Sequence, residues 1–271
     1  MVSVDRYVSF PWYDLPEMHD ATDALWRALA AALRARGIAD VPLALDRSRP
    51  HGTDGEAACL FTQTCGYPLF TTAHRHFTVL GAPHYAVAGA VAGTHRSFIV
   101  VRAGDSAERL ADLRGRRFAI NELDSNSGMN LPRRLFAPLA REGRFFASTV
   151  VTGSHAASAA AIARGDADAA AIDCVTFALL ARYRPHVVAE LRMLGETFAT
   201  ATPPFVTSSG ADAQLVLALR EAIDDVLAAP AHADVRDATL LRRLGRCDAD
   251  AYDLVMSYER EAIALGYHII A

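Results

Sequence analysis

Apolar and polar positions alternate along most of the chain between strand-like runs and helix-like stretches. Apolar residues recur at spacings of three and four over residues 21–33, and Gly37 follows as a stop, which predicts a helix. Short apolar runs bounded by Pro, Gly or Asp predict strands at residues 7–10, 41–45, 57–61, 97–101, 118–121, 146–151 and 169–172. Further helices are predicted to begin near Gly128 and His155. Strands and helices in this alternation indicate an α/β fold.

The pattern changes in the last third of the chain. The prolines at 203 and 204 precede a short apolar run at residues 205–207. The rest of the chain is predicted to be helical, with helix starts near Asp212, Asp234 and Asp248.

Glycine and proline positions mark where the chain divides into lobes. Two glycines lie in residues 89–96 and two prolines in residues 198–204, and both stretches interrupt the regular pattern. We predict that residues 1–95 plus 204–271 form a first lobe and residues 96–203 an inserted second lobe, with a ligand cleft between them. Two crossings between the same lobes form a hinge, a common device for closing over a ligand.

Composition excludes several classes of partner and chemistry. The net charge of -4 provides no positive field for nucleic acid or an anionic membrane, so we predict neither partner. All 27 basic residues are arginine, which excludes a Schiff-base lysine and a lysine-dependent phosphate loop. The sequence has no G-x-S-x-G turn that would expose a nucleophilic serine. We therefore predict no catalytic residues and no cofactor.

The N-terminus and the cysteines bear on cellular location. Residues 1–26 carry several charges and no uninterrupted apolar stretch, which predicts a cytoplasmic protein. No window approaches the roughly 18 apolar residues of a membrane-spanning helix. Irregular spacing predicts that Cys59, Cys65, Cys174 and Cys247 are reduced thiols, and a bridge from Cys59 to Cys65 is the alternative.

Two short polar turns each follow a predicted strand and open a predicted helix. The first is Asp124-Ser125-Asn126-Ser127-Gly128 and the second is Gly153-Ser154-His155. A helix start offers unpaired backbone N–H groups, and serine hydroxyls add donors without adding charge. The pair of turns predicts capture of a small oxyanion, with Ser125, Asn126, Ser127 and His155 as ligands. The alternative is that these residues only cap their helices.

Other polar residues have two possible roles. Asp173 ends the predicted strand 169–172, where it is placed to accept a proton from a P–OH group or a ligand amine; its alternative role is N-cap of the next helix. His74, His76 and His84 share a strand-like pattern, but no carboxylate or cysteine completes a metal-ligand spacing. No metal site is predicted.

Two segments carry a family resemblance. Residues Asn121–Pro132 (NELDSNSGMNLP) and Gly153–Phe177 (GSHAASAAAIARGDADAAAIDCVTF) resemble, in order and spacing, the phosphate, phosphite and phosphonate-binding family of ABC transporter receptors. The resemblance implies the type II periplasmic binding-protein fold, with two α/β lobes joined by a two-strand hinge. It places Ser125, Asn126, Ser127 and His155 at ligand positions. It also implies a periplasmic location and an ABC transporter permease as a partner.

The resemblance extends to the first lobe by position alone. Residues 61–68 lie where the family carries a ligand loop, so Gln63, Thr64 and Tyr67 are candidate donors and aromatic contacts, and Tyr13 is another. The alternative for both tyrosines is a place in the core. Cys174 and Val175 stand where some phosphonate receptors place an amine-binding acid, which disfavours an aminoalkylphosphonate ligand.

These observations predict a solute-binding protein for phosphate, phosphite or a phosphonate. An alternative is a cytosolic enzyme on the same scaffold that acts on a small organic acid, as the menaquinone-pathway enzymes do. A third possibility is a sensor that reports its ligand to a protein partner.

Overall fold

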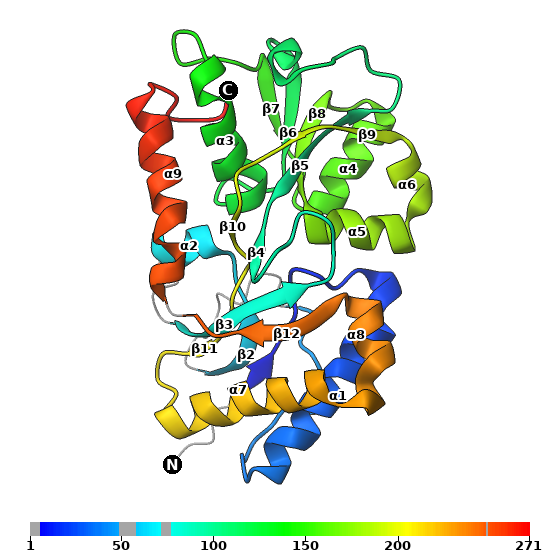
Figure 1. Cartoon of the computed structure of the whole chain (residues 1–271), viewed down its shortest axis with the longest axis vertical. Helices are drawn as coiled ribbons and strands as arrows, with labels where there is room; N and C mark the ends of the chain where they lie inside the picture. The colour runs from blue at the N-terminus through cyan, green and yellow to red at the C-terminus, as the bar shows by residue number, and fades with distance from the viewer. Residues whose placement is uncertain (1–5, 49–57, 72–76, 248) are drawn as a thin grey trace. The chain divides into compact units, whose positions relative to one another are not determined.

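The computed structural model describes residues 6–48, 58–71, 77–247 and 249–271, which form two compact units (Figure 1). Unit 1 comprises Met1–Ala86, Val91–Thr94 and Ala201–Ala251. Unit 2 comprises Val87–Ala90, His95–Thr200 and Tyr252–Ala271. Each unit contains one mixed sheet with helices packed on it, so the predicted α/β class is confirmed.

Unit 1 is built on a five-stranded sheet in the order β1-β2-β11-β3-β12. Its strands are β1 (Tyr7–Val8), β2 (Cys59–Gln63), β3 (Phe77–Tyr85), β11 (Phe205–Ser208) and β12 (Leu241–Gly245). Its helices are α1 (His19–Ala35), α2 (Gly66–Thr71), α7 (Ala213–Ala228) and α8 (Ala233–Thr239). Helix α7 packs on β3, β12 and α1. Trp26 from α1 stacks on Phe61, whose ring lies edge-on to Phe205 at 5.0 Å, so aromatic rings from three elements form the core.

Unit 2 has a second five-stranded sheet in the order β7-β6-β8-β5-β9. Its strands are β5 (Ser97–Arg102), β6 (Arg117–Ile120), β7 (Ser148–Val151), β8 (Ala169–Asp173) and β9 (Leu191–Glu196). Its helices are α3 (Leu131–Phe136), α4 (His155–Arg164), α5 (Cys174–Tyr183), α6 (Pro185–Ala189) and α9 (Asp253–Ala264). Helix α4 packs on β5, β6 and β8. Phe118, Phe136, Phe145 and Phe146 pack against one another in the core, in stacked and edge-to-face pairs.

Short elements join these parts. The two-stranded sheet of β4 (Thr94–His95) and β10 (Thr200–Ala201) lies where the chain passes from one unit to the other. The 3-10 turns in the described part of the chain include η1 (Pro16–Met18), η4 (Leu110–Leu113), η6 (Ala137–Leu139), η7 (Pro230–His232) and η8 (Ala249–Tyr252).

Most predicted elements are present, and the differences have physical causes. Residues 41–45 form no strand, because their carbonyls accept from α1 side chains: Arg34 donates to Val41 and Trp26 to Pro42. Strand β12 lies in the stretch predicted to be all helical, where it pairs antiparallel with β3. Strands β3 and β9 were not predicted.

The C-terminal segment also differs from expectation. The sequence assigned residues 204–271 to the first lobe, whereas Tyr252–Ala271 groups with unit 2. Helix α9 packs on α3, and the Asn130 side chain donates to the Val255 carbonyl at 3.0 Å. These contacts hold the segment in unit 2.

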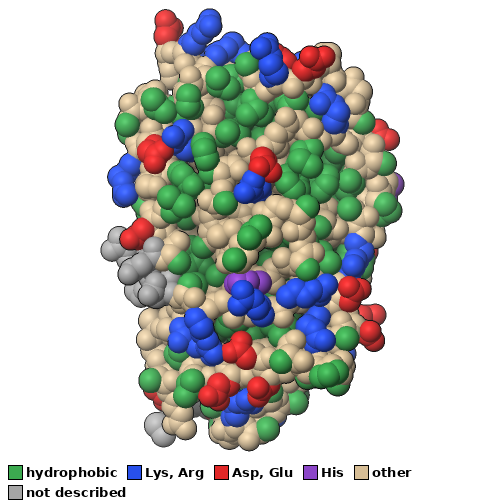
Figure 2. Space-filling view, viewed as in Figure 1, with side chains coloured by type: hydrophobic (Ala, Val, Ile, Leu, Met, Phe, Trp, Pro, Cys, Tyr) green, Lys and Arg blue, Asp and Glu red, His purple; other side chains and the backbone are tan. Residues whose placement is uncertain are grey.

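Three further properties concern membranes, thiols and surface charge. None of the helices in the described part of the chain has the length and apolar character needed to cross a membrane. Cys59, Cys65 and Cys174 are buried, and Cys247 is half-buried. Arginine and acidic side chains are interspersed on the face shown in Figure 2. Arg246 and Asp224 at 2.6 Å and Arg117 and Asp168 at 2.7 Å form two of the ion pairs.

Candidate functional site

The first polar turn folds as a buried π-helix. Ser125 is its N-cap, and its Oγ accepts from the Gly128 N–H at 3.0 Å. The π-helix η5 (Asn126–Asn130) precedes α3, so the helix expected at Gly128 begins with a wider turn. π-helices are rare and often mark functional sites. We call residues 124–130 the serine turn.

Gly128 lets the serine turn pack against its neighbours. A Cβ at this position would lie 1.8 Å from the Asn121 Oδ1 and 3.1 Å from the His155 Cε1. The close approach therefore requires a residue without a side chain. In this way the sequence brings β6, the serine turn and α4 into contact.

Ser127 and His155 meet across the two predicted turns. The Ser127 Oγ lies 2.7 Å from the His155 Nε2, and the His155 Nδ1 lies 3.0 Å from the Ala171 carbonyl oxygen. Both side chains are buried. Ser154, not His155, caps α4, because the Ser154 Oγ accepts from the Ala157 N–H at 3.0 Å. The His155 ring is directed at the sheet instead.

Asp173 has the capping role and also adjoins the histidine. Its carboxylate accepts from the N–H groups of Val175 and Thr176 at the start of α5, and from the Thr176 hydroxyl. The Asp173 Oδ2 is 3.8 Å from the His155 Nε2, and the Oδ1 is 4.0 Å from the His95 Nδ1. Capping therefore orients a carboxylate between two buried imidazoles.

Burial decides the protonation of this cluster. It lowers the pKa of His155, and the opposing effects of Asp173, the Ala171 carbonyl and Glu122 do not reverse that shift. Burial lowers the pKa of His95 to about 4, although Asp173 acts in the opposite direction. Both imidazoles are therefore neutral at pH 7. Burial also raises the pKa of the Cys174 thiol to about 12, which makes it inert.

Sequence reasoning did not find three residues that support the cluster. The Ser97 hydroxyl donates to the Ser127 carbonyl at 2.9 Å. The His95 Nδ1 is buried and has no hydrogen-bond partner among the described residues. The Asn130 amide donates to the Asn126 Oδ1 at 3.1 Å as well as to α9, so it connects the serine turn to the C-terminal segment. The contacts of Ser97 with Ser127 and of Asn130 with Val255 join segments far apart in the chain, so no local motif predicts them.

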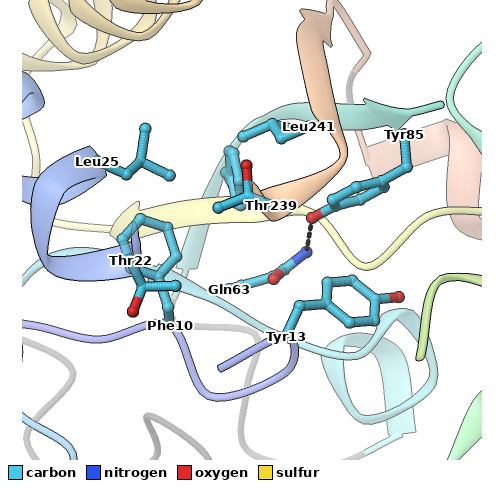
Figure 3. Close-up of a pocket in the computed structure, with 9 residues that line it drawn as sticks. Phe10, Tyr13, Thr22, Leu25, Gln63, Tyr85, Thr239 and Leu241 are labelled. Carbon is cyan, nitrogen blue, oxygen red and sulfur yellow. Dashed lines mark hydrogen bonds between the residues drawn. The ribbon is translucent and has the colours of Figure 1, made fainter. Parts of the chain in front are cut away.

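In unit 1, Gln63 and Tyr13 line a small pocket. The Gln63 amide donates to the Pro203 carbonyl at 2.9 Å and lies 3.4 Å from the Tyr85 hydroxyl, toward which it points in Figure 3. The rings of Tyr13 and Tyr85 are edge-to-face, with centroids 5.1 Å apart. The cavity of about 20 Å³ is lined by Phe10, Tyr13, Thr22, Leu25, Gln63, Tyr85, Phe205, Thr239 and Leu241.

The other predicted residues lie elsewhere. Thr64 and Tyr67 are buried but do not line this pocket. His74 and His76 lie outside the described residues, and His84 is on β3. Among the residues that the structure describes, no group of three or more His, Cys, Asp or Glu side chains is arranged to hold a metal ion. The structure thus brings the unit 2 candidates into one cluster and two unit 1 candidates into one pocket.

Comparison with known proteins adds the family to this geometry. The family model described as "ABC transporter, phosphonate, periplasmic substrate-binding protein" matches residues 8–252. The chain belongs to this family. The phosphonate-binding family consists of binding proteins and not of enzymes, so the chain is a phosphonate-class ABC transporter substrate-binding protein and the alternative enzyme assignment is set aside.

Solved structures share the fold at low sequence identity. A binding-protein component of an ABC phosphonate transporter from Pseudomonas aeruginosa has a TM-score of 0.74 at 14% identity and covers 96% of this chain and 87% of its own. PhnD1 from Prochlorococcus marinus in complex with methylphosphonate has a TM-score of 0.74 at 14% identity, over 98% and 100% of the chains. XAC2383 from Xanthomonas citri, bound to chloride, has a TM-score of 0.69 at 15% identity, over 98% and 100%. No curated protein sequence matches the chain. The predicted type II periplasmic binding-protein fold is confirmed.

Proposed function

We propose that this chain binds phosphate, phosphite or a small phosphonate through both groups of candidate residues. The unit 2 group is Ser125, Asn126, Ser127, His155 and Asp173. The unit 1 group is Tyr13, Gln63, Thr64 and Tyr67. The buried contact of Ser127 with His155 beside Asp173 is the observation that carries the proposal, because it gathers polar groups at the starts of the serine turn and α4.

The chemistry of the unit 2 group suits an oxyanion. Hydroxyls and helix-start N–H groups supply donors without the desolvation cost of a buried cation. Asp173 can only accept when ionised, so a ligand oxygen that faces it must carry a hydrogen. This arrangement favours a protonated oxyanion over an ionised one.

The unit 1 group suits the substituent on phosphorus. Tyr13 and Tyr85 offer ring surfaces, and the pocket beside them has room for a methyl group or a water molecule. Methylphosphonate, found in PhnD1 from Prochlorococcus marinus, is therefore a suitable probe. Cys174 and Val175 offer no acid for an amine, so an aminoalkylphosphonate should bind more weakly.

Family membership supports two further parts of the proposal. The family is periplasmic and serves ABC transporters. We infer that this chain works in the periplasm and delivers its ligand to an ABC transporter permease.

Titration calorimetry with phosphate, phosphite and methylphosphonate tests the proposal. Ser125→Ala and Ser127→Ala should each weaken binding by roughly 1–2 kcal/mol, the value of a hydrogen bond to a charged group. Ser106→Ala is the matched control, because Ser106 is exposed in unit 2 outside the serine turn. Failure of all three ligands, with unchanged affinity of both serine variants for any other ligand, would contradict it.

A further inference from the structure

The hydrogen-bond roles of His155 follow from its two partners. The Ala171 carbonyl oxygen, 3.0 Å from the Nδ1, can only accept, so the Nδ1 carries the hydrogen. In a neutral imidazole the Nε2 then has a lone pair and no hydrogen. The Ser127 Oγ, 2.7 Å away, must donate its one hydroxyl hydrogen to that Nε2.

This polarity restricts what Ser127 offers a ligand. With its hydrogen directed at His155, the Ser127 Oγ presents only lone pairs. An ionised phosphonate oxygen also presents only lone pairs, so the two oxygens repel unless a proton lies between them. The proton can arrive as a P–OH group that donates to the Ser127 Oγ. Alternatively, the His155 Nε2 can take up the proton and donate a hydrogen bond to the Ser127 Oγ. The Ser127 hydroxyl hydrogen can then be donated to the ligand. Both routes leave the complex with the same number of protons.

We propose that the Ser127–His155 pair binds its oxyanion together with one additional proton. The substrate class is then an oxyanion with an acidic P–OH group, such as a phosphonate or hydrogen phosphate, in preference to a sulfonate of the same shape. This inference rests on the proposed function, which places the ligand oxygen beside Ser127.

The charged groups that face His155 favour the additional proton. The Asp173 Oδ2 lies 3.8 Å from the Nε2, and Glu122 acts on the ring in the same sense. His95, on the other side of Asp173, is the remaining titratable ring in the cluster, and burial keeps it neutral. Burial lowers the pKa of His155, which keeps the ring neutral before the ligand arrives.

Calorimetry in buffers with different ionisation enthalpies measures how many protons the complex takes up when the ligand binds. At alkaline pH, where the phosphonate has lost its second proton, methylphosphonate binding to the wild-type protein should take up about one proton per ligand. His155→Gln places an amide donor near the position of the Nε2, which frees the Ser127 hydrogen permanently. In that variant the uptake should fall toward zero. Its preference for methylphosphonate over methanesulfonate should shrink by about tenfold.

Two calorimetric results would overturn the inference. One is wild-type binding with no dependence of its enthalpy on the buffer. The other is undiminished proton uptake by folded His155→Gln, which would assign the proton to Asp173.

Nitrogen-15 NMR of the ligand-free wild-type protein supplies a test that needs neither variant nor ligand. It should show His155 as the Nδ1–H tautomer, and an Nε2–H tautomer would overturn the inference. If phosphate, phosphite and methylphosphonate all fail to bind, the proposed function fails, and the tautomer still decides whether Ser127 has the polarity described.

Discussion

The cluster around the serine turn of unit 2 and the pocket of unit 1 differ in their chemistry. The serine turn and its neighbours are polar and buried, and His155 lies 2.7 Å from the Ser127 Oγ and 3.8 Å from the Asp173 Oδ2. The pocket is lined by aromatic, aliphatic and neutral polar side chains, with Gln63 directed at Tyr85. The proposed function assigns recognition of charge and proton content to the unit 2 cluster and recognition of shape to the unit 1 pocket.

The two regions also differ in how well they tolerate substitutions. In the serine turn, polar groups are already paired with each other, so a small displacement leaves buried groups without partners at a cost of about 1–3 kcal/mol each. In the pocket, a cavity of about 20 Å³ leaves space for adjustment. Substitutions should therefore have larger effects in the serine turn.

The largest effect is expected for Gly128→Ala. Its Cβ would collide with the Asn121 amide and press on His155, so binding of methylphosphonate should fall by more than tenfold and stability by about 1–3 kcal/mol. Calorimetry and urea unfolding measure the two losses. The double variant Asn121→Ala/Gly128→Ala should recover part of the stability. Gly104→Ala, which meets nothing within 4 Å, is the matched control. Wild-type affinity in Gly128→Ala would show that the serine turn is not rigid.

Acid should weaken unit 2 through His95. Its pKa is about 4 in the folded protein and 6.5 in the unfolded chain, so between these values the unfolded chain binds more protons. The contribution of His95 to the free energy of unfolding is complete above about pH 6.5 and is lost as the pH falls to about 4. The free energy of unfolding changes by about 3 kcal/mol over this range. Urea unfolding at several pH values should show that acidification lowers the free energy of unfolding less in His95→Asn than in the wild-type protein.

A control separates this effect from general acid sensitivity. His186 is exposed in unit 2, so acidification should lower the free energy of unfolding of His186→Asn as much as that of the wild-type protein. An identical pH dependence in the two variants would show that His95 does not carry it.

The smallest effect is expected for Tyr85→Phe in the pocket. The lost hydroxyl lies a long 3.4 Å from the Gln63 amide, which keeps its 2.9 Å bond to the Pro203 carbonyl. Stability should change by less than about 1 kcal/mol and methylphosphonate affinity by less than about threefold. Tyr85→Ala, which removes the ring, should cost several times more. If Tyr85→Phe lost as much methylphosphonate affinity as Ser127→Ala, the contrast between the two regions would disappear.

Local sequence predicted the position of the serine turn and offered the capping role of Asp173 as an alternative, because turn and cap chemistry depends on residues a few positions apart. Ser125 and Asp173 cap their helices as the alternatives stated, and His155 follows a cap instead of forming one. The π-helix at Asn126–Asn130 was not predicted, since its wider turn depends on packing against Asn121 and α9.

Non-local contacts escaped prediction. Ser97 and Asp173 are opposite each other in the pairing of β5 with β8, which brings Ser97 and the neighbouring His95 to the cluster. Tyr85 reaches Gln63 because β3 and β2 both pair with β11. Neither pairing has a signature within a short window of sequence.

By itself, the sequence determined the α/β alternation, the two polar helix starts and the family to which they point. Hydrophobic periodicity and helix capping depend on residues a few positions apart, so they can be predicted from the sequence. Only the tertiary structure decided that Ser127 contacts His155, that Asp173 lies between two neutral imidazoles, and that α9 supports the serine turn. These outcomes depend on strand register and helix packing, which arise from contacts between residues far apart in the chain.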